Sequence, residues 1–469
     1  MAVARSTLAI VAAFWLAAET TLDTRQGFAE QAAGHAPASS VYPLKVSDSN
    51  RYLVDQSGAP FLLIGDSPQS LIGNLSLADI AFYMENRARY GINALWVNLL
   101  CNAGTACNAD GTTFDGIPPF TTAGDLSTPN PAYFARVDEA LRIANANGMV
   151  VLLNPIETIG WLEVLRQNGI AKARAYGEFL GTRYRDFPNI IWMHGNDFQS
   201  WRDARDKVLV QSVARGIRSV DPVHLHTIEL NYLSSGSLDD PSWRTLIELD
   251  AAYSYYPTYA EILKEYNRLD PLPTFLVEAN YEFERNPDTD GGALPNLRRQ
   301  TYWTMLSGAT GQLYGSAFTW RFPSGWKEHL DSPGIRELMH MSRLIGGLNW
   351  WGLVPDQGHD IVTAGFGTFN ARGSIASDPY VTAAAAPSGD LMVAYLPTAQ
   401  AITIDMSQLP RVNRARWYDP TNGTFQDANE ELAIDHSQRR FTPPPRNASS
   451  HDDWILVLDN AQSDSHTSN

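Results

Sequence analysis

Two carboxylates stand at the ends of short apolar segments, 81 residues apart: Asp197 follows IIWMHGN, and Glu278 closes TFLVE. A glycosidase needs two such groups, one as general acid and base and one opposite it as nucleophile. In a retaining enzyme the two carboxyl groups are about 5–5.5 Å apart, and in an inverting enzyme the gap is wider. The alternative for each carboxylate alone is a helix cap or an ion pair with arginine. Together, the two carboxylates predict a glycosidase pair.

Other polar and aromatic side chains end the same kind of segment and are candidates for binding a sugar. Asn196 suits a donor to the sugar 2-hydroxyl, and Asp66 in LIGDSPQSL could bind substrate hydroxyls or serve as a turn residue. About half of the aromatic residues near segment ends are expected to wall a sugar pocket, and the rest to be core; they are Trp192, Trp201, Tyr255, Tyr256, Tyr281, Tyr314 and Trp320. Four further carboxylates compete for the catalytic roles and are interpreted as supporting or structural: Glu157, Glu229, Glu282 and Glu284.

His224 and His226 form an HxH pair, which can hold a metal in hydrolase barrels. Because no HExxH or larger histidine set accompanies the pair, substrate contact by His226 or structural hydrogen bonding is favoured over a metal. We expect no metal and no cofactor. The sequence also lacks a GxSxG elbow, a Walker loop and a GxGxxG motif, so serine hydrolase, NTPase and dinucleotide-binding functions have no support. With 51 acidic and 35 basic residues, the formal charge of −16 argues against a nucleic-acid partner.

The elements that must position these residues alternate between short apolar runs and longer amphipathic stretches. This alternation predicts β–α units, and eight apolar runs match a (β/α)8 TIM barrel over residues 42–350, with its active site at the carboxyl ends of the strands. A doubly wound open sheet is the alternative. The expected strands are 61–65, 94–99, 149–154, 190–194, 224–228, 251–255, 274–278 and 310–315.

Beyond Pro355 the helical periodicity fades, and short alternating segments are separated by Pro, Gly and Asn clusters. This pattern predicts an all-β sandwich domain at 355–459. Residues 460–469 are polar and without aromatic side chains, so a disordered tail is expected there.

The first 29 residues are interpreted as a signal peptide, because Arg5 precedes an apolar run of about eleven residues at 8–18, too short to span a bilayer. The mature protein is therefore expected to be periplasmic or extracellular, without a membrane span. Cys101 and Cys107 are the two cysteines of the chain, and an oxidising compartment predicts a disulfide between them.

Four motifs, IGDSPQSL, IIWMHGND, PTFLVEANYE and GATGQLYGSAFTW, occur in an order and spacing that resembles the apiosidase-like glycoside hydrolases of family 140. The resemblance covers residues 42–350. RWYDPTNGTF, FTPPP and DWILVL resemble the small β-sandwich that follows this barrel and is named for collagen binding, although collagen is not expected as a partner.

The resemblance implies a retaining mechanism with Asp197 as acid/base and Glu278 as nucleophile, and pocket roles for Asp66, Tyr314 and Trp320. The flanking residues differ, since the family usually has Gly-Gly-Asp where this chain has Gly195-Asn196-Asp197. The sequence thus predicts release of a terminal sugar, such as apiose, from a plant or microbial polysaccharide. The alternatives are a non-catalytic carbohydrate-binding barrel and, less favoured, a metal-dependent hydrolase that uses His224 and His226.

Overall fold

The computed structural model describes residues 42–285, 289–428 and 437–460. The expected signal peptide at 1–29 lies outside the described residues, and so does the expected tail from residue 461 onward. Among the described residues, no helix is both long enough and apolar enough to cross a membrane.

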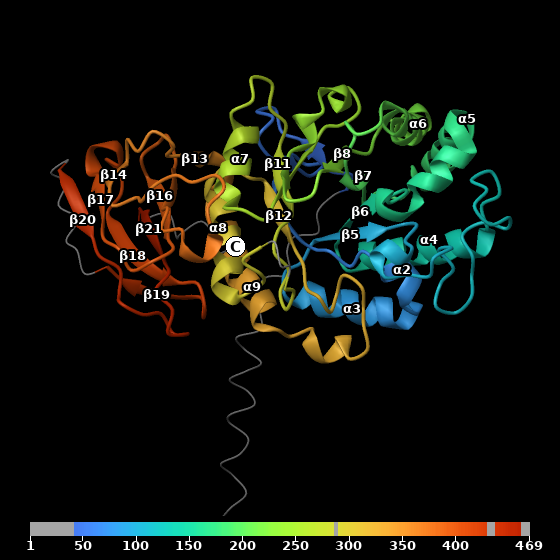
Figure 1. The fold of residues 1–469 in the computed structure, drawn as a ribbon. Helices are drawn as coiled ribbons and strands as arrows, with labels where there is room; N and C mark the ends of the chain where they lie inside the picture. The colour runs from blue at the N-terminus through green and yellow to red at the C-terminus, as the bar shows by residue number, and fades with distance from the viewer. Residues whose placement is uncertain (1–41, 286–288, 429–436, 461–469) are drawn as a thin grey trace, which may run out of the picture. The chain divides into compact units, whose positions relative to one another are not determined.

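Eight parallel strands form the central sheet, in the spatial order β8, β7, β6, β5, β4, β12, β11 and β10, and the short β9 pairs antiparallel with β10 (Figure 1). Seven of the eight predicted strands agree with the structure to within two residues at each end, and β7 runs four residues further, to Phe198. The strands are β4 (Leu63–Asp66), β5 (Ala94–Asn98), β6 (Val150–Asn154), β7 (Ile190–Phe198), β8 (His226–Leu230), β9 (Ser234–Ser235), β10 (Asp250–Ser254), β11 (Thr274–Glu278) and β12 (Gly311–Tyr314).

The sheet curves until β8 lies beside β10, where a serine side chain replaces ladder hydrogen bonds. Ser237 Oγ donates to the carbonyl of Ile228 on β8 and accepts the N–H of Ala251 on β10 at 2.8 Å. The architecture is therefore a nearly closed (β/α)8 barrel, as predicted, rather than a doubly wound open sheet.

Helices follow the strands and cover the outside of the barrel (Figure 1). Ser76 caps one helix by accepting the N–H of Asp79, and Asn130 caps another, directly before Pro131, by accepting the N–H of Ala132. The helices are α2 (Leu71–Asn74), α3 (Leu77–Arg89), α4 (Pro131–Ala146), α5 (Thr158–Tyr184), α6 (Ala204–Val220), α7 (Thr258–Tyr266), α8 (Leu294–Leu306) and α9 (Pro333–Gly346).

Alternate residues of most barrel strands belong to different buried clusters. One cluster fills the barrel interior and the other fills the layer between strands and helices. On β7, for example, Ile191 and Met193 belong to the interior cluster, whereas Trp192 belongs to the outer layer. This alternation decides which strand-end side chains can reach a site at the barrel mouth.

A small antiparallel sheet of β1 (Lys45–Val46), β2 (Leu53–Val54) and β3 (Pro60–Phe61) precedes the barrel. Leu53 and Phe61 join the interior cluster, and the backbone N–H of Leu53 donates to Thr310 Oγ1 at 3.0 Å just before β12. This sheet therefore packs against the amino-terminal ends of the strands, opposite the end where an active site is expected.

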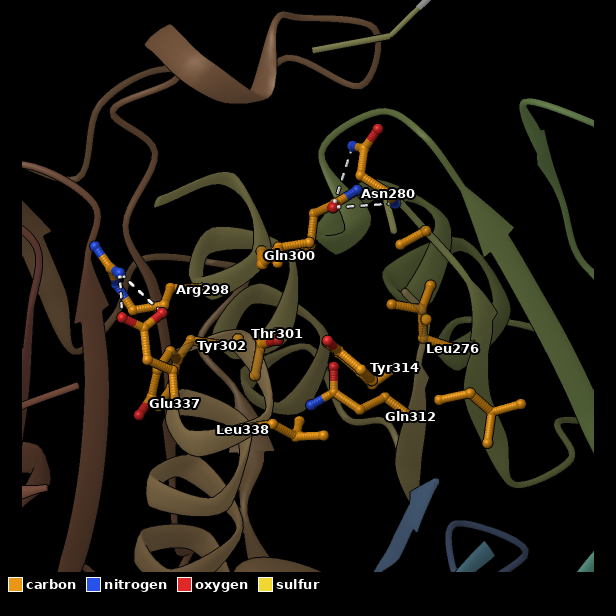
Figure 2. Close-up of a pocket in the computed structure, with 15 residues that line it drawn as sticks. Leu276, Asn280, Arg298, Gln300, Thr301, Tyr302, Gln312, Tyr314, Glu337 and Leu338 are labelled. Carbon is orange, nitrogen blue, oxygen red and sulfur yellow. Dashed lines mark hydrogen bonds and ion pairs between the residues drawn. The ribbon is translucent and has the colours of Figure 1, made fainter. Parts of the chain in front are cut away.

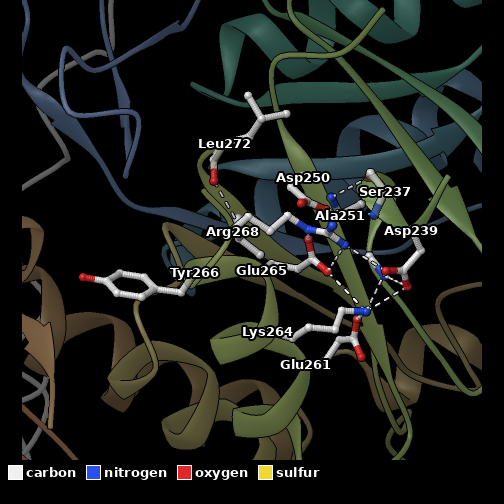
Figure 3. A network of polar contacts seen from close by, with 12 residues as sticks. Ser237, Asp239, Asp250, Ala251, Glu261, Lys264, Glu265, Tyr266, Arg268 and Leu272 are labelled. Carbon is white, nitrogen blue, oxygen red and sulfur yellow. Dashed lines mark hydrogen bonds and ion pairs between the residues drawn. The ribbon is translucent and has the colours of Figure 1, made fainter. Parts of the chain in front are cut away.

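An ion-pair network ties α7 to the connection between β9 and β10 (Figure 3). Asp239, Glu261 and Glu265 bring one carboxylate oxygen each within 4.8 Å of one another, a spacing that could hold a metal ion. Lys264 Nζ already lies 2.8 Å from Asp239 and 2.5 Å from Glu261, and Arg268 binds Glu265 and Asp239. Because the chain's own cations neutralise these carboxylates, we assign the network a structural role.

Two antiparallel sheets follow the barrel, one of six strands and one of three, which confirms the predicted all-β module. Their inner faces share a buried cluster that includes Met392, Ile404 and Trp454. The strands are β13 (Val354–Pro355), β14 (Val362–Ala364), β15 (Thr382–Ala385), β16 (Leu391–Leu396), β17 (Ile402–Asp405), β18 (Arg414–Asp419), β19 (Thr424–Asp427), β20 (Gln438–Phe441) and β21 (Trp454–Asp459).

The other face of the six-stranded sheet packs on α8. Tyr302 of α8 stacks on Tyr395 of β16 with ring centroids 5.1 Å apart, and Trp303 Nε1 donates to the carbonyl of Tyr380 at 2.9 Å. Arg298 of α8 binds Asp453, next to β21, at 2.7 Å. The sandwich and the barrel therefore share one buried layer.

Candidate active site

Both predicted catalytic carboxylates lie at irregularities in their strands. In β7 the pairing with β8 shifts between Gly195 and Phe198, which places Asp197 inside the irregular stretch. Between β10 and β11 the register also shifts, so that Glu278 rather than Val277 lies opposite Tyr253. Such bulges re-aim side chains next to active sites, and here they bring the two carboxylates to the carboxyl end of the barrel.

The backbone that carries Asp197 is held in an unusual conformation. Gly195, Asn196 and Asp197 all have positive φ, at 92°, 103° and 50°. Thr158 Oγ1 donates to the Asn196 carbonyl at 2.7 Å, and Asn154 Nδ2 donates to the Gly195 carbonyl at 3.1 Å. Where the family usually has a second glycine, this chain has Asn196, one of the few other residue types that tolerate positive φ. Strand β6 and the start of α5 therefore hold the backbone segment that carries Asp197.

Three tyrosine hydroxyls surround Glu278. Tyr253 and Tyr255 donate to Oε1, and Tyr281 donates to Oε2, each at 2.9 Å. Each of these hydrogen bonds stabilises the ionised carboxylate. By contrast, Asp197 Oδ1 is buried and has no hydrogen-bond partner among the described residues.

The two carboxyls share a raised affinity for protons. Burial raises the pKa of Asp197 to about 6, against a smaller opposing effect of the Tyr253 hydroxyl. Burial, and then the charge of Asp197, raises the pKa of Glu278 to about 8, against the opposing effect of its tyrosines. The pair therefore holds one proton near pH 7, which the two carboxyls share.

Two more carboxyls lie close enough to interact with this pair. Glu157 caps α5 by accepting the N–H of Gly160 at 2.9 Å, and burial raises its pKa to about 7, with the Asp197 charge as a smaller cause. Glu229 of β8 is fully buried, and burial, Glu278 and Asp197, in that order, raise its pKa well above the usual range. The site is thus a cluster of carboxyls in which proton placement decides the chemistry.

The structure brings several predicted binding residues to this cluster. Tyr255 and Tyr281 contact Glu278, and Asn196 accepts a hydrogen bond from Asn98 Nδ2 at 3.4 Å beside Asp197. Trp320 is half-buried beyond β12, with the Arg321 guanidinium 5.0 Å from its ring centroid. The substrate-binding roles of these four residues stay predictions.

Asp66 and Tyr314 require a correction, because both point into the layer between strands and helices. Asp66 is fully buried, forms an ion pair with Arg87 of α3 at 2.5 Å, and accepts the Tyr83 hydroxyl at 2.6 Å. Tyr314 donates its hydroxyl to Glu282. Their polar atoms already have hydrogen-bond or ion-pair partners inside the protein, so neither residue is a candidate for binding substrate.

His226 also requires a correction. It is fully buried in the outer layer, where its Nδ1 lies 3.0 Å from His194 Nε2, and His194 stacks near Trp243. His224 binds Asp221 at 2.7 Å. In the part of the chain that the structure describes, neither His224 nor His226 belongs to a group of three metal-ligating side chains. The HxH pair is therefore structural.

Tyr253, which donates to Glu278, is not among the residues predicted from the sequence. A signal was present, because Tyr253 and Tyr255 are two residues apart on one strand and so share a face. The sequence predicts only a supporting or structural role for Glu229, because a sequence does not show whether a carboxyl group has hydrogen-bond partners.

The Cys101–Cys107 disulfide is present in the loop after β5. A Cβ atom added at Gly73 of α2 would lie 2.6 Å from Cys101 Sγ, so α2 packs closely on the bridge. The disulfide therefore closes the loop on itself, and α2 packs against the closed loop.

A pocket lies behind β11 and β12, against α8 and α9 (Figure 2). Its lining includes Leu276, Gln312 and Tyr314, while Arg298 and Glu337 form an ion pair at its side. Neither Asp197 nor Glu278 lines it. This pocket belongs to the layer between strands and helices and is separate from the carboxyl cluster.

A (β/α)8 barrel with buried carboxyls at the ends of its fourth and seventh strands defines a glycoside hydrolase. A family model described as "Apiosidase-like, catalytic domain" matches residues 47–352, and the chain belongs to this family. A second model, "Putative collagen-binding domain of a collagenase", matches residues 372–459.

Solved structures share the fold over most of the chain. One described as "Glycoside hydrolase" has a TM-score of 0.76 at 20% identity, covering 91% of this chain and 99% of its own. A glycoside hydrolase family 5 protein from Bacteroides vulgatus ATCC 8482 has a TM-score of 0.76 at 21% identity, covering 89% and 94%. A search of curated proteins found no match.

Proposed function

We propose that the chain is an exported, retaining glycoside hydrolase that releases a terminal sugar, apiose or a related sugar, from a plant or microbial polysaccharide. The observation that carries the mechanism is the contrast between the two carboxyls. Glu278 accepts three tyrosine hydroxyls, whereas Asp197 Oδ1 has no partner among the described residues. Glu278 thus suits the ionised nucleophile, and Asp197 suits the acid that meets the glycosidic oxygen.

The first step moves one proton and exchanges one bond. Asp197 gives its proton to the glycosidic oxygen, and the leaving group departs as an alcohol. Glu278 forms an ester with the anomeric carbon. The proton must therefore lie on Asp197 when substrate is bound, and the glycosidic oxygen favours this by offering an acceptor there.

In the second step the Asp197 carboxylate removes a proton from water, and the resulting hydroxide attacks the anomeric carbon. The ester bond breaks, Glu278 regains its charge and Asp197 regains its proton. Two displacements at one carbon retain its configuration, so the released sugar has the same anomeric form as the substrate.

The proposed sugar specificity and the proposed export are supported by separate observations. The family description supports apiose as the first sugar to test. Export is supported by the apolar run at 8–18 after Arg5 and by the Cys101–Cys107 disulfide, since disulfides persist in oxidising compartments. Amino-terminal sequencing of the secreted protein tests export, and full-length chain found only in the cytosol contradicts it.

The test of function is incubation of the chain with pectic and hemicellulosic oligosaccharides, beside the variants Asp197→Asn and Glu278→Gln. We expect a monosaccharide from the wild type and a loss of at least about 100-fold in kcat for each variant, because each removes a group that enters the reaction. Chromatography and mass spectrometry identify the product. Equal release by the variants contradicts the assignment, and binding without release by the wild type indicates a carbohydrate-binding protein.

A further inference from the structure

Glu229 occupies a position that the two-carboxylate mechanism does not use. It lies on β8 in register with Gly195 of β7. Ile228 and Leu230 belong to the outer layer, so the alternation directs Glu229 into the barrel. Its side chain is fully buried, and neither carboxyl oxygen has a hydrogen-bond partner among the described residues.

A buried carboxyl without partners needs an explanation. Removing such a group from water costs free energy that a hydrogen bond or an opposite charge normally recovers. An apolar or amide side chain of similar size would avoid this cost at a purely structural position. Natural proteins keep such unfavourable groups mainly at functional sites.

The charges that act on Glu229 from inside the barrel are negative. Glu278 of β11 and Asp197 of β7 both raise its pKa, and the Tyr253 hydroxyl of β10 also interacts with it. The backbone N–H of Asp197 has a smaller opposing effect. Burial and these negative charges therefore favour the uncharged form of Glu229.

The other titratable groups around β8 are directed elsewhere. His226 and His194 lie in the outer layer, and the charge of Arg218 acts on them there. Asp239 and Asp250 belong to the network around α7.

The proposed reaction moves one negative charge from Glu278 to Asp197. On Glu278 the charge is stabilised by three tyrosine hydroxyls, whereas Asp197 Oδ1 has no hydrogen-bond partner in the part of the chain that the structure describes. The charges of both carboxyls act on Glu229. An uncharged carboxylic acid in a dry site supplies an O–H dipole and adds no charge of its own.

Resting on the proposed function, we propose that Glu229 is a positioning residue, a buried carboxylic acid whose O–H stabilises the Asp197 carboxylate in the glycosyl-enzyme. It forms and breaks no covalent bond. Its contribution is confined to the state in which Asp197 has lost its proton, so it affects kcat rather than substrate binding.

The test compares Glu229→Gln, which keeps a donor and no charge, with Glu229→Leu, which removes the donor. We expect Glu229→Gln to keep kcat within about 3-fold, with unchanged pH limits. We expect Glu229→Leu to lower kcat by about 10- to 100-fold, the usual effect of one hydrogen bond to a charged group, at nearly constant KM. Its melting temperature should equal or exceed that of the wild type, because an unpartnered polar group is gone. A structural role would lower it.

Asp250→Asn is the matched control. Asp250 is also a fully buried carboxyl, but it lies at the amino-terminal end of β10, away from Tyr253 and the carboxyl cluster. It should leave kcat unchanged. If Glu229→Leu does not fold, Glu229→Met serves as the apolar variant. The inference is overturned if Glu229→Gln loses as much activity as the apolar variant, if its pH limits move, or if the apolar variant keeps wild-type kcat. If the wild type is active and the Glu229 variants have unchanged activity, only this inference is overturned. If the wild type is inactive, the proposed function is overturned as well.

Discussion

Asp197 and Glu278 have different surroundings, and the difference supports the roles proposed for them. One Asp197 oxygen has no hydrogen-bond partner among the described residues, whereas Glu278 accepts three tyrosine hydroxyls. Both carboxyls were predictable from the sequence, because each follows an apolar run of strand length. The tyrosine contacts were not fully predictable, because hydrogen bonding depends on how two strands are aligned.

The pH dependence of activity follows from the shared proton. Below about pH 6 both carboxyls are protonated, so no nucleophile is available, and above about pH 8 both are ionised, so no acid is available. We expect a bell-shaped profile of kcat/KM between these limits for the free enzyme. Measuring initial rates from pH 4 to 10 tests this. Activity that rises without a limit toward pH 10 contradicts a protonated acid in the pair.

The errors at Asp66, Tyr314 and His226 have one physical cause. A polar residue at a strand end can face either the barrel mouth or the helices, and alternation from the buried residues before it decides which. A bulge breaks this rule. Leu276 faces the helices, so strict alternation would make Glu278 face the helices too. The register shift between β10 and β11 instead directs Glu278 toward the carboxyl cluster. The sequence shows the apolar runs but not the bulges.

Among the secondary-structure elements, β7 and β8 position the carboxyl cluster at the point where their pairing becomes irregular. A Cβ atom added at Gly195 would lie 2.0 Å from the Glu229 carbonyl oxygen, and φ at Gly195 is +92°. We therefore expect Gly195→Ala to destabilise the fold by at least about 2 kcal/mol and to lower kcat by about 10-fold or more, because the Asp197 segment must move. Thermal melting and kinetics measure both.

Gly148→Ala is the control, since Gly148 also has positive φ, at +71°, with no atom within 4 Å of the added Cβ. It should cost about 1 kcal/mol through backbone strain and leave kcat unchanged. Equal effects of the two substitutions would show that backbone strain, rather than the close approach of β8, explains Gly195.

For the whole molecule, Arg298 joins the barrel to the sandwich. It binds Glu337 of α9 at 2.9 Å and Asp453 at 2.7 Å, and all three side chains are buried. The sequence predicted both modules but not this bridge, because its three members are far apart in the chain. Their pairing depends on how the six-stranded sheet packs on α8.

We expect Arg298→Met to destabilise the protein by about 3–5 kcal/mol at pH 7, because two carboxyls lose their counter-ion. Burial already raises the pKa of Glu337 to about 7 against the lowering effect of Arg298, and without the cation that pKa rises further, so the free energy of unfolding falls as pH rises. The deficit should therefore be larger at pH 7 than at pH 5. Melting curves at both pH values, with the exposed Arg411→Met as control, measure it. A deficit independent of pH contradicts the electrostatic role.

The central claim is that Glu278 forms a covalent bond with the released sugar. The most direct measurement uses the Asp197→Asn variant with an activated aryl glycoside of that sugar, whose leaving group departs without acid help, while the second step lacks its base. Peptide mass mapping after a rapid quench should find one sugar on the peptide that contains Glu278. Turnover without any adduct, or an adduct on a different carboxyl, would contradict the account.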